Sequence, residues 1–170
     1  MEQNATIGEP DSQLGVLRMV HDVLTLRPDL VFVEFEVNDS GNESSVILRS
    51  LEGIVRKIWK TYPDCDICFV YTTTPALLTA TPKGYLHRSA SLSERIADYY
   101  HIPSVYLPWD VDKLLNEDKL MMKAPERKMT VVAGDELNVS KKNMKEPDGK
   151  IYFSLDGVHP YLNTGHVVYT

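Results

Sequence analysis

The pattern of apolar and polar positions switches repeatedly between helical and strand-like spacing along this chain. Apolar residues at helical spacing come first, and that pattern stops at Arg27-Pro28. A nearly continuous apolar run from Leu30 to Phe35 follows, which is typical of a strand covered on both faces. The run ends in a turn-rich segment at residues 37–41. The apolar positions of the first predicted helix are Leu14, Leu17, Val20, Val23 and Leu24.

Helices and strands are predicted to alternate further downstream. Strands are expected from Ile67 to Tyr71 and from Ile102 to Leu107. From Lys123 to Lys150 the periodicity fades, which predicts a surface excursion with a small hairpin around Met129 to Val132, and order returns at Ile151. Three further helices are marked by Ile47, Leu51, Ile54, Val55 and Ile58, then by Leu92, Ile96, Ala97 and Tyr100, and then by Val111, Leu114, Leu115 and Leu120.

This alternation predicts an α/β fold, in which a parallel sheet carries helices on both faces. We expect one domain spanning residues 1–170, with the excursion at about 123–150 on its surface. Folds of this kind place their chemistry at the carboxyl ends of the strands. Asn38 falls at the end of the first predicted strand, so it is a candidate site residue.

Composition argues against several classes of protein. Of the 170 residues, 43% are hydrophobic and 25% are charged, which is typical of a globular protein. The formal net charge of −6 argues against binding to nucleic acid or to anionic lipid. No stretch is apolar for long enough to predict a membrane span, and residues 1–30 hold no signal-peptide core. If the natural chain begins further upstream, that second observation leaves its localisation undecided.

The two cysteines, Cys65 and Cys68, have the spacing of a redox or metal-binding pair. A redox pair normally opens a helix, where the helix dipole lowers the thiol pKa. Here the pair runs into the β-rich segment Ile67 to Tyr71, and residues three apart on a strand point to opposite faces. We therefore expect two packed thiols at the start of a strand, not joined by a disulfide.

The segment Asp156-Gly157-Val158-His159-Pro160 is the strongest candidate for catalysis. An acid three residues before a histidine can lie on the same side of one tight turn. Its carboxylate would then accept a hydrogen bond from one imidazole nitrogen and fix the tautomer, while the other nitrogen acts as a base. An ordinary turn gives the same spacing, so this motif alone leaves both interpretations open.

Asn38 has a comparable pair of interpretations. At the end of a strand its side-chain NH₂ group can point into a site and stabilise the negative charge that develops on a reacting oxygen. Asparagine in a turn-rich segment also caps or turns the chain without any catalytic role.

Taken together and in this order, the two motifs resemble the SGNH or GDSL family of serine hydrolases. Glu36-Val37-Asn38-Asp39 is similar to the family block that holds the oxyanion asparagine, with Glu36 where the family often has Gly. The last block of the family is matched by Asp156, His159 and Pro160, and Gly165-His166 fits the Gly-His pair that often follows it.

Two more family blocks concern the start of the chain. Residues 4–15 are similar to the block that supplies an oxyanion glycine, which assigns Gly8, with Glu9 where a second Gly is usual. The block with the nucleophilic serine, Gly-Asp-Ser, is expected before Met1. Pro10-Asp11-Ser12 imitates it, but no apolar strand precedes Ser12 to place it on an elbow.

The resemblance implies a three-layer α/β/α sandwich with a flavodoxin-like parallel sheet, truncated at its N-terminal strand and its C-terminal helix. It implies ester hydrolysis by a Ser-His-Asp triad whose serine lies outside this chain. Asp156 would orient His159, and Asn38 and Gly8 would stabilise the oxyanion. The expected substrate is a small-molecule or glycan ester, with acetylated carbohydrate first and lipid or thioester second. No metal and no organic cofactor is implied.

Two alternatives from other classes remain open at this point. A non-catalytic ligand-binding module would keep the same fold and pocket without the nucleophile, and a reading frame with no Gly-Asp-Ser upstream would favour it. A flavodoxin-like redox or nucleotide-binding domain would need a Gly-rich phosphate loop after its first strand, and the sequence shows no such loop.

Overall fold

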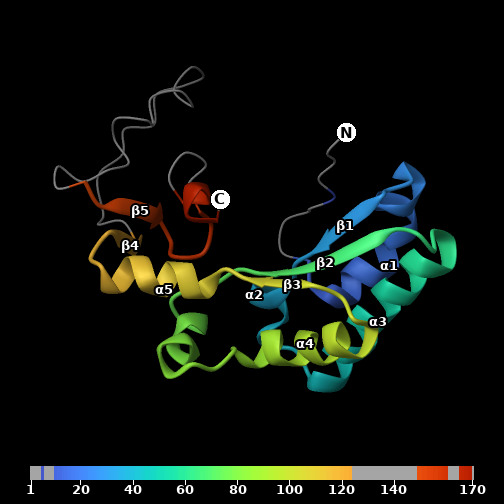
Figure 1. The fold of residues 1–170 in the computed structure, drawn as a ribbon, viewed down its shortest axis with the longest axis horizontal. Helices are drawn as coiled ribbons and strands as arrows, with labels where there is room; N and C mark the ends of the chain where they lie inside the picture. Colours follow the sequence, from blue (N-terminus) through green and yellow to red (C-terminus); the bar gives the residue numbers. More distant parts are fainter. Residues whose placement is uncertain (1–4, 6–9, 124–148, 161–164, 170) are drawn as a thin grey trace, which may run out of the picture. The chain divides into compact units, whose positions relative to one another are not determined.

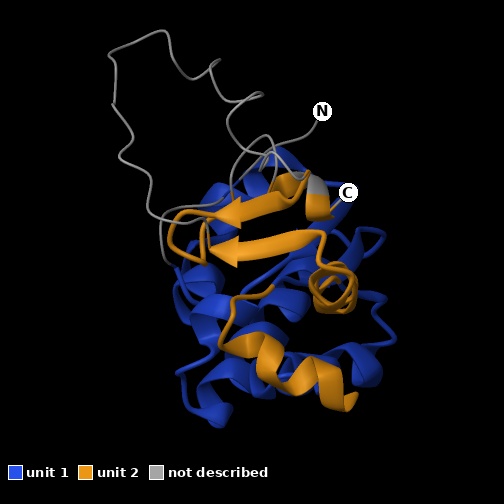
Figure 2. Cartoon of the chain, turned by 90° about the vertical axis from the view of Figure 1, so that its left-hand side faces the viewer, with its two compact units in different colours: residues 1–72, 86–106 blue, residues 73–85, 107–170 orange. Residues whose placement is uncertain are grey.

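The computed structural model describes residue 5 and residues 10–123, 149–160 and 165–169. Their contacts divide the chain into two compact units, coloured separately in Figure 2. Unit 1 consists of residues 1–72 and 86–106, and unit 2 consists of residues 73–85 and 107–170. Each unit has its own hydrophobic core. The expectation of one domain over residues 1–170 stays a prediction.

Unit 1 is built on a three-stranded parallel sheet with the order β1-β2-β3 (Figure 1). Its strands are β1 (Leu30–Val33), β2 (Asp66–Tyr71) and β3 (Ser104–Tyr106). Because all three strands run the same way, their carboxyl ends share one edge of the sheet. The structure thus confirms an α/β fold with a parallel sheet, although β1 and β3 are shorter than the apolar runs that predicted them.

Two long helices of unit 1 follow the sequence pattern closely. They are α3 (Ser44–Thr61) and α4 (Arg88–Tyr100). The five residues that mark the apolar face of α3 are each at most 2% exposed: Ile47, Leu51, Ile54, Val55 and Ile58.

No described helix is both long and apolar enough to cross a membrane.

Helix α1 (Ser12–Asp22) forms as predicted, but it buries a different face from the one its large apolar residues mark. Leu17 is 71% exposed and Val20 is 55% exposed, whereas Met19 is only 5% exposed. The core-facing side includes Gly15, where an added Cβ would lie 2.5 Å from Cζ of Phe35. A glycine lets the helix approach its neighbours closely. The buried face of α1 is therefore set by close packing at a small residue and not by the number of large apolar residues.

Helices α1, α3 and α4 pack on one face of the sheet (Figure 1). Alternate strand residues, including Val31 and Phe69, point into that core. On the opposite face Leu30, Phe32 and Val105 are 46%, 65% and 45% exposed. Among the described residues of unit 1, the sheet is therefore covered by helices on one side, and β1 is not covered on both faces as its apolar run suggested.

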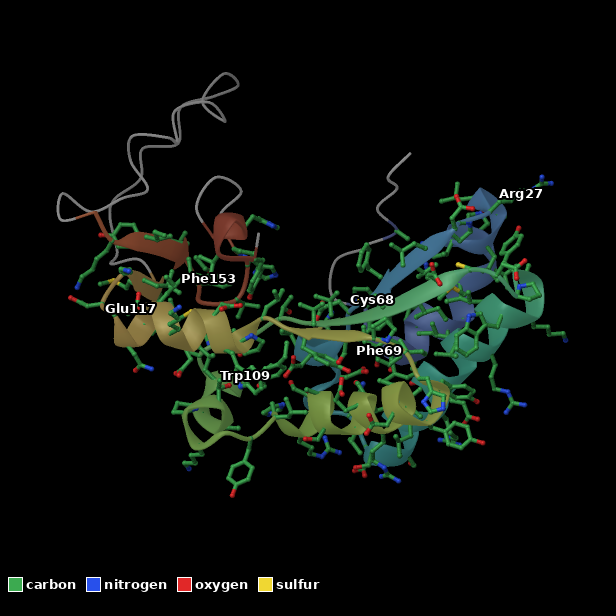
Figure 3. The ribbon with its side chains drawn as sticks, viewed as in Figure 1. Arg27, Cys68, Phe69, Trp109, Glu117 and Phe153 are labelled. Atoms are coloured by element: carbon green, nitrogen blue, oxygen red, sulfur yellow. The ribbon has the colours of Figure 1, made fainter. Side chains whose placement is uncertain are left out.

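The two cysteines behave as predicted. Cys65 is buried, Cys68 is partly buried, and neither belongs to a disulfide. Figure 3 shows Phe69 on the side of the sheet that carries the helices, with Cys68 on the other side. Burial raises the pKa of both thiols, so neither is activated as a nucleophile.

Unit 2 has a two-stranded parallel sheet of β4 (Leu120–Lys123) and β5 (Ile151–Ser154). Helix α5 (Pro108–Asn116) and the 3₁₀ helices η2 (Leu77–Lys83) and η4 (His166–Tyr169) complete it. Phe153 is fully buried and packs edge-to-face on Tyr169, with ring centroids 5.5 Å apart.

One sequence-based assignment in this unit is wrong. The helix predicted to reach Leu120 ends at Asn116, and Leu120 instead begins β4. Leu120 is buried against the core of unit 2 from the strand, so its apolar character fits either element and spacing alone did not separate them. The excursion expected at about 123–150, with a hairpin around Met129 to Val132, falls almost entirely outside the described residues.

The close packing of α1 yields a stability test. Replacing a helical glycine by alanine normally stabilises a helix by about 0.5–1 kcal/mol. At Gly15 the new methyl group would meet the ring of Phe35, so we expect Gly15→Ala to lower the free energy of unfolding, by about 1–3 kcal/mol.

Gly41→Ala is the matched control, because no atom lies within 4 Å of its added Cβ. It should change the free energy of unfolding by less than about 0.5 kcal/mol. Urea denaturation measures both variants, and a stabilised Gly15→Ala protein would show that α1 does not pack in this way.

Candidate functional site

The Asp156–His159 contact that the spacing predicts is present. Oδ2 of Asp156 lies 2.7 Å from Nδ1 of His159. The two side chains are 53% and 74% exposed, so the pair is accessible from solvent. A carboxylate at Nδ1 selects the tautomer with the proton on that nitrogen, which makes Nε2 the atom that can take a proton from a substrate group.

The other oxygen of Asp156 holds the turn in shape. Oδ1 accepts the backbone N–H groups of Val158 and His159, at 2.8 and 2.9 Å. It also accepts the hydroxyl of Ser154 at 2.6 Å. One carboxylate thus receives donors from four groups, and it fixes the backbone of the turn as well as the imidazole ring.

Ser154 connects this turn to the end of β5. Its side chain is fully buried, and its Oγ accepts the backbone N–H groups of Asp156 and Gly157 at 3.1 and 2.8 Å. Sequence analysis did not identify Ser154, although serine two residues before an aspartate is a recognisable local turn signal. A bridge between Ser154 and Pro160 closes the turn back onto the strand.

Gly157 meets a conformational demand of the same turn. Its φ is +89°, which lies in the left-handed region that favours glycine. An added Cβ would lie 3.4 Å from Cγ of Pro75, in the other segment of unit 2, which is an ordinary van der Waals contact. The Gly of the Asp-Gly-Val-His motif is therefore required by backbone conformation and not by space.

These donors shift the ionisation of Asp156. The hydrogen bond from His159 has the largest effect, followed by that from Ser154, and together with the backbone N–H groups they hold the pKa of Asp156 far below its usual 3.8. Because the folded-state pKa is depressed, the stabilisation that these bonds give is present above about pH 4 and is lost as the pH falls further.

Removing one donor tests this account. We expect Ser154→Ala to raise the pKa of Asp156 toward the usual value, because its carboxylate loses the hydroxyl donor. Titration of the Asp156 carboxyl carbon by NMR measures the change. Ser91→Ala is the control, since the Ser91 hydroxyl donates to the carbonyl oxygen of Leu86 within unit 1. An unchanged Asp156 titration in Ser154→Ala would show that the hydroxyl does not support the carboxylate.

Asn38 belongs to unit 1 and lies in the four-residue helix α2 (Glu36–Asp39), five residues beyond the last residue of β1. Its side chain is exposed, and its Nδ2 donates to the carbonyl oxygen of Pro10 at 2.8 Å. An amide NH₂ group has two hydrogens, so this bond engages one of them and leaves a second donor for a substrate oxygen.

The structure brings some of the predicted site residues together and describes others separately or not at all. Asp156 and His159 lie together in unit 2, whereas Asn38 is described with unit 1, and the joint action of Asn38 and His159 that the resemblance implies stays a prediction. Gly8 lies outside the described residues. Ser12, which imitates the nucleophile motif, is fully buried at the first position of α1, so a substrate cannot reach its hydroxyl.

A buried acid lies beside Asn38. Glu36 is 2% exposed, and neither of its carboxyl oxygens has a hydrogen-bond partner among the described residues. Burial, and then the negative charge of Glu34, raises the pKa of Glu36 to about 8. Between the usual pKa of 4.5 and this value, the unfolded chain releases a proton that the folded chain keeps, so stability falls as the pH rises.

Glu36→Gln should remove this pH dependence, because glutamine has nearly the same size and does not ionise. One pKa unit corresponds to about 1.4 kcal/mol, so the variant should be more stable than the parent at pH 7 by about 2–3 kcal/mol. Urea unfolding at several pH values measures the difference. Glu43→Gln, at an exposed position, is the control. If the free energy of unfolding depends on pH equally in the parent and in Glu36→Gln, the raised pKa of Glu36 is refuted.

A parallel α/β sheet and a histidine oriented by a carboxylate are features that hydrolases combine. Comparison with solved structures agrees with this class. The chain is similar to the crystal structure of a two-domain esterase active on acetylated mannans, with 28% identity and a TM-score of 0.55. That match covers 68% of this chain and 29% of the esterase chain.

A second crystal structure, of a two-domain esterase active on acetylated mannans co-crystallised with mannopentaose, gives 27% identity and a TM-score of 0.52. It covers 66% of this chain and 28% of the other. The chain thus spans less than a third of the length of these esterases. No family model matches the chain, and no curated protein matches it. These findings show an esterase-like α/β fold.

Proposed function

We propose that this chain is part of a serine esterase of the SGNH type, which removes acyl groups from an O-acylated carbohydrate. The observation that carries the proposal is the Asp156–His159 contact, in which the carboxylate fixes both the ring and the turn behind it. The similarity to esterases active on acetylated mannans supports a glycan ester as the substrate class.

In the proposed reaction, Nε2 of His159 takes the proton of a serine hydroxyl while the serine oxygen forms a bond to the acyl carbon. The carbonyl oxygen becomes an oxyanion, which accepts hydrogen bonds from the second Nδ2–H of Asn38 and from a backbone N–H at Gly8. As the oxyanion collapses, the bond to the sugar oxygen breaks and His159 returns the proton to that oxygen. Water then releases the acyl group from the serine by the same steps.

Asp156 does not receive the proton in this scheme. Its pKa lies far below the usual range, so it stays ionised next to the imidazolium that forms during each step. The carboxylate is already held by Ser154 and two backbone N–H groups, and it need not reorganise when the ring becomes charged.

The proposal places the serine on a segment outside these 170 residues, because Ser12 is buried. It also includes a three-layer arrangement. Leu30, Phe32 and Val105 form an apolar surface on the sheet face opposite the helices, which a further layer would cover. Burying such side chains is worth about 25 cal/mol per Å² of apolar surface.

The test compares the 170-residue chain with a polypeptide extended along the natural reading frame through an upstream Gly-Asp-Ser segment. The shorter chain should not react with a fluorophosphonate probe, and the extended one should be labelled at that serine and release acetate from acetylated mannan. In the extended polypeptide, His159→Ala should lower kcat by a factor of about 10⁶.

His21→Ala is the matched control, because Nδ1 of His21 also contacts an aspartate, Asp22, at 2.6 Å on an exposed surface. It should leave kcat unchanged. Labelling of Ser12 in the shorter chain would overturn the assignment of the nucleophile. A reading frame with no serine at the expected position would instead make the chain a ligand-binding module.

A further inference from the structure

We infer that Asp39 and Asn42 are positioning residues, which orient the side-chain amide of Asn38 through a closed network of hydrogen bonds with the start of α1. The inference rests on the proposed role of Asn38 as an oxyanion donor. All residues of the network lie within unit 1, and the structure describes all of them.

The network joins two segments that are far apart in the sequence. Asn38 donates to the carbonyl oxygen of Pro10 at 2.8 Å. Two residues further along, the backbone N–H of Ser12 donates to Oδ1 of Asp39 at 3.0 Å. Since Asn38 and Asp39 are adjacent, these two bonds hold residues 10–12 against α2 at two points. One bond alone would leave the segment able to pivot.

Asn42 closes the network from the other side. Its Nδ2 donates one hydrogen to Oδ2 of Asp11 and the other to Oδ1 of Asp39, both at 3.1 Å. The amide thus lies between two carboxylates and uses both of its donors. Asp11 in turn caps α1 by accepting the backbone N–H of Leu14 at 2.9 Å.

Burial and a nearby cation keep this arrangement rigid. Asp39 is 1% exposed and Ser12 is fully buried, so the bond between them is shielded from water. The backbone of Asn42 is fixed separately, because the guanidinium of Arg88 on α4 donates to its carbonyl oxygen at 2.8 Å. Asn38, by contrast, is exposed, which places a held donor group at the surface.

The consequence for Asn38 is geometric. An amide NH₂ group is planar, so fixing one N–H toward the Pro10 carbonyl also fixes the direction of the second. Rotation of the Asn38 side chain would break the bond to Pro10, and displacement of Pro10 would break the bond between Ser12 and Asp39. An oxyanion donor that is held before the substrate arrives needs no reorganisation during the reaction.

The structure also predicts how substitutions at Asp39 differ. Oδ1 of Asp39 accepts the hydrogen bonds from Ser12 and Asn42, whereas Oδ2 has no hydrogen-bond partner among the described residues. Asp39→Asn can therefore keep an acceptor oxygen at the Oδ1 position and should retain the network in large part. Asp39→Ala removes the acceptor and should release the segment, and Asn42→Ala should have a smaller effect because it leaves the Ser12 bond in place.

The first experiment is independent of activity. In the 170-residue chain, NMR of the Asn38 side-chain NH₂ group should show one hydrogen protected from exchange with solvent. Asp39→Ala should reduce that protection at least tenfold, while Asp39→Asn should largely preserve it. Ile58→Val, a core substitution remote from the network, is the control for a general loss of stability. Unchanged protection in Asp39→Ala would overturn the inference.

The second experiment uses the extended, active polypeptide and p-nitrophenyl acetate. Asn38→Ala should lower kcat by about 10²–10³-fold, as expected for an oxyanion donor. Asp39→Ala should lower kcat by about 10–100-fold with KM unchanged, since small misplacements cost this much. The double variant should be no slower than Asn38→Ala alone, because Asp39 acts only through Asn38.

The two experiments separate the possible failures. A double variant that is slower than Asn38→Ala by the full effect of Asp39→Ala would overturn the positioning role. If Asn38→Ala leaves kcat unchanged while exchange protection depends on Asp39 as expected, the network is real and the proposed catalytic role of Asn38 is wrong. Asp64→Asn, an exposed acid outside the network, should change neither measurement.

Discussion

Aspartate oxygens that accept backbone N–H groups hold both candidate segments of this chain in shape. Asp156 accepts the backbone N–H groups of Val158 and His159 and thereby folds the turn that carries the imidazole. Asp39 accepts the backbone N–H of Ser12 and thereby ties the start of α1 to the residue next to Asn38. In both places a candidate site residue is oriented by a neighbouring aspartate.

The core of unit 1 shows where sequence periodicity succeeds and where it fails. Helix α3 was predicted with its buried face, because large apolar residues line one side of it and nothing competes. Helix α1 was predicted as a helix but with the wrong face, since Leu17 points to solvent and Gly15 faces Phe35. A periodicity argument counts large apolar residues, whereas the face that is buried depends on which side chains fit closely against the neighbouring elements. Leu120 was assigned to a helix for a similar reason, because one apolar residue at the right spacing fits a strand equally well.

The candidate site divides in the same way between local and distant contacts. The pairing of Asp156 and His159 could be predicted because three residues of chain are enough to bring the groups together. The bond from Asn38 to Pro10 spans 28 residues, and no local pattern encodes it. Glu36 illustrates the same limit, since a glutamate in the sequence gives no sign that it will be buried without a partner. Its raised pKa follows from tertiary packing alone.

Each half of the proposed site is therefore organised by contacts within its own unit. Residues 154–160 orient the imidazole, and α2, residues 10–12 and Asn42 hold the Asn38 amide. Hydrolysis would require these two preorganised halves to meet at one serine, and most of the orientation would already be fixed before they do. The entropy of ordering the acid, the base and the oxyanion donor is then lost during folding and not during the reaction, which is how a positioned site lowers its barrier. Mutations that loosen either half should act on turnover more than on substrate binding.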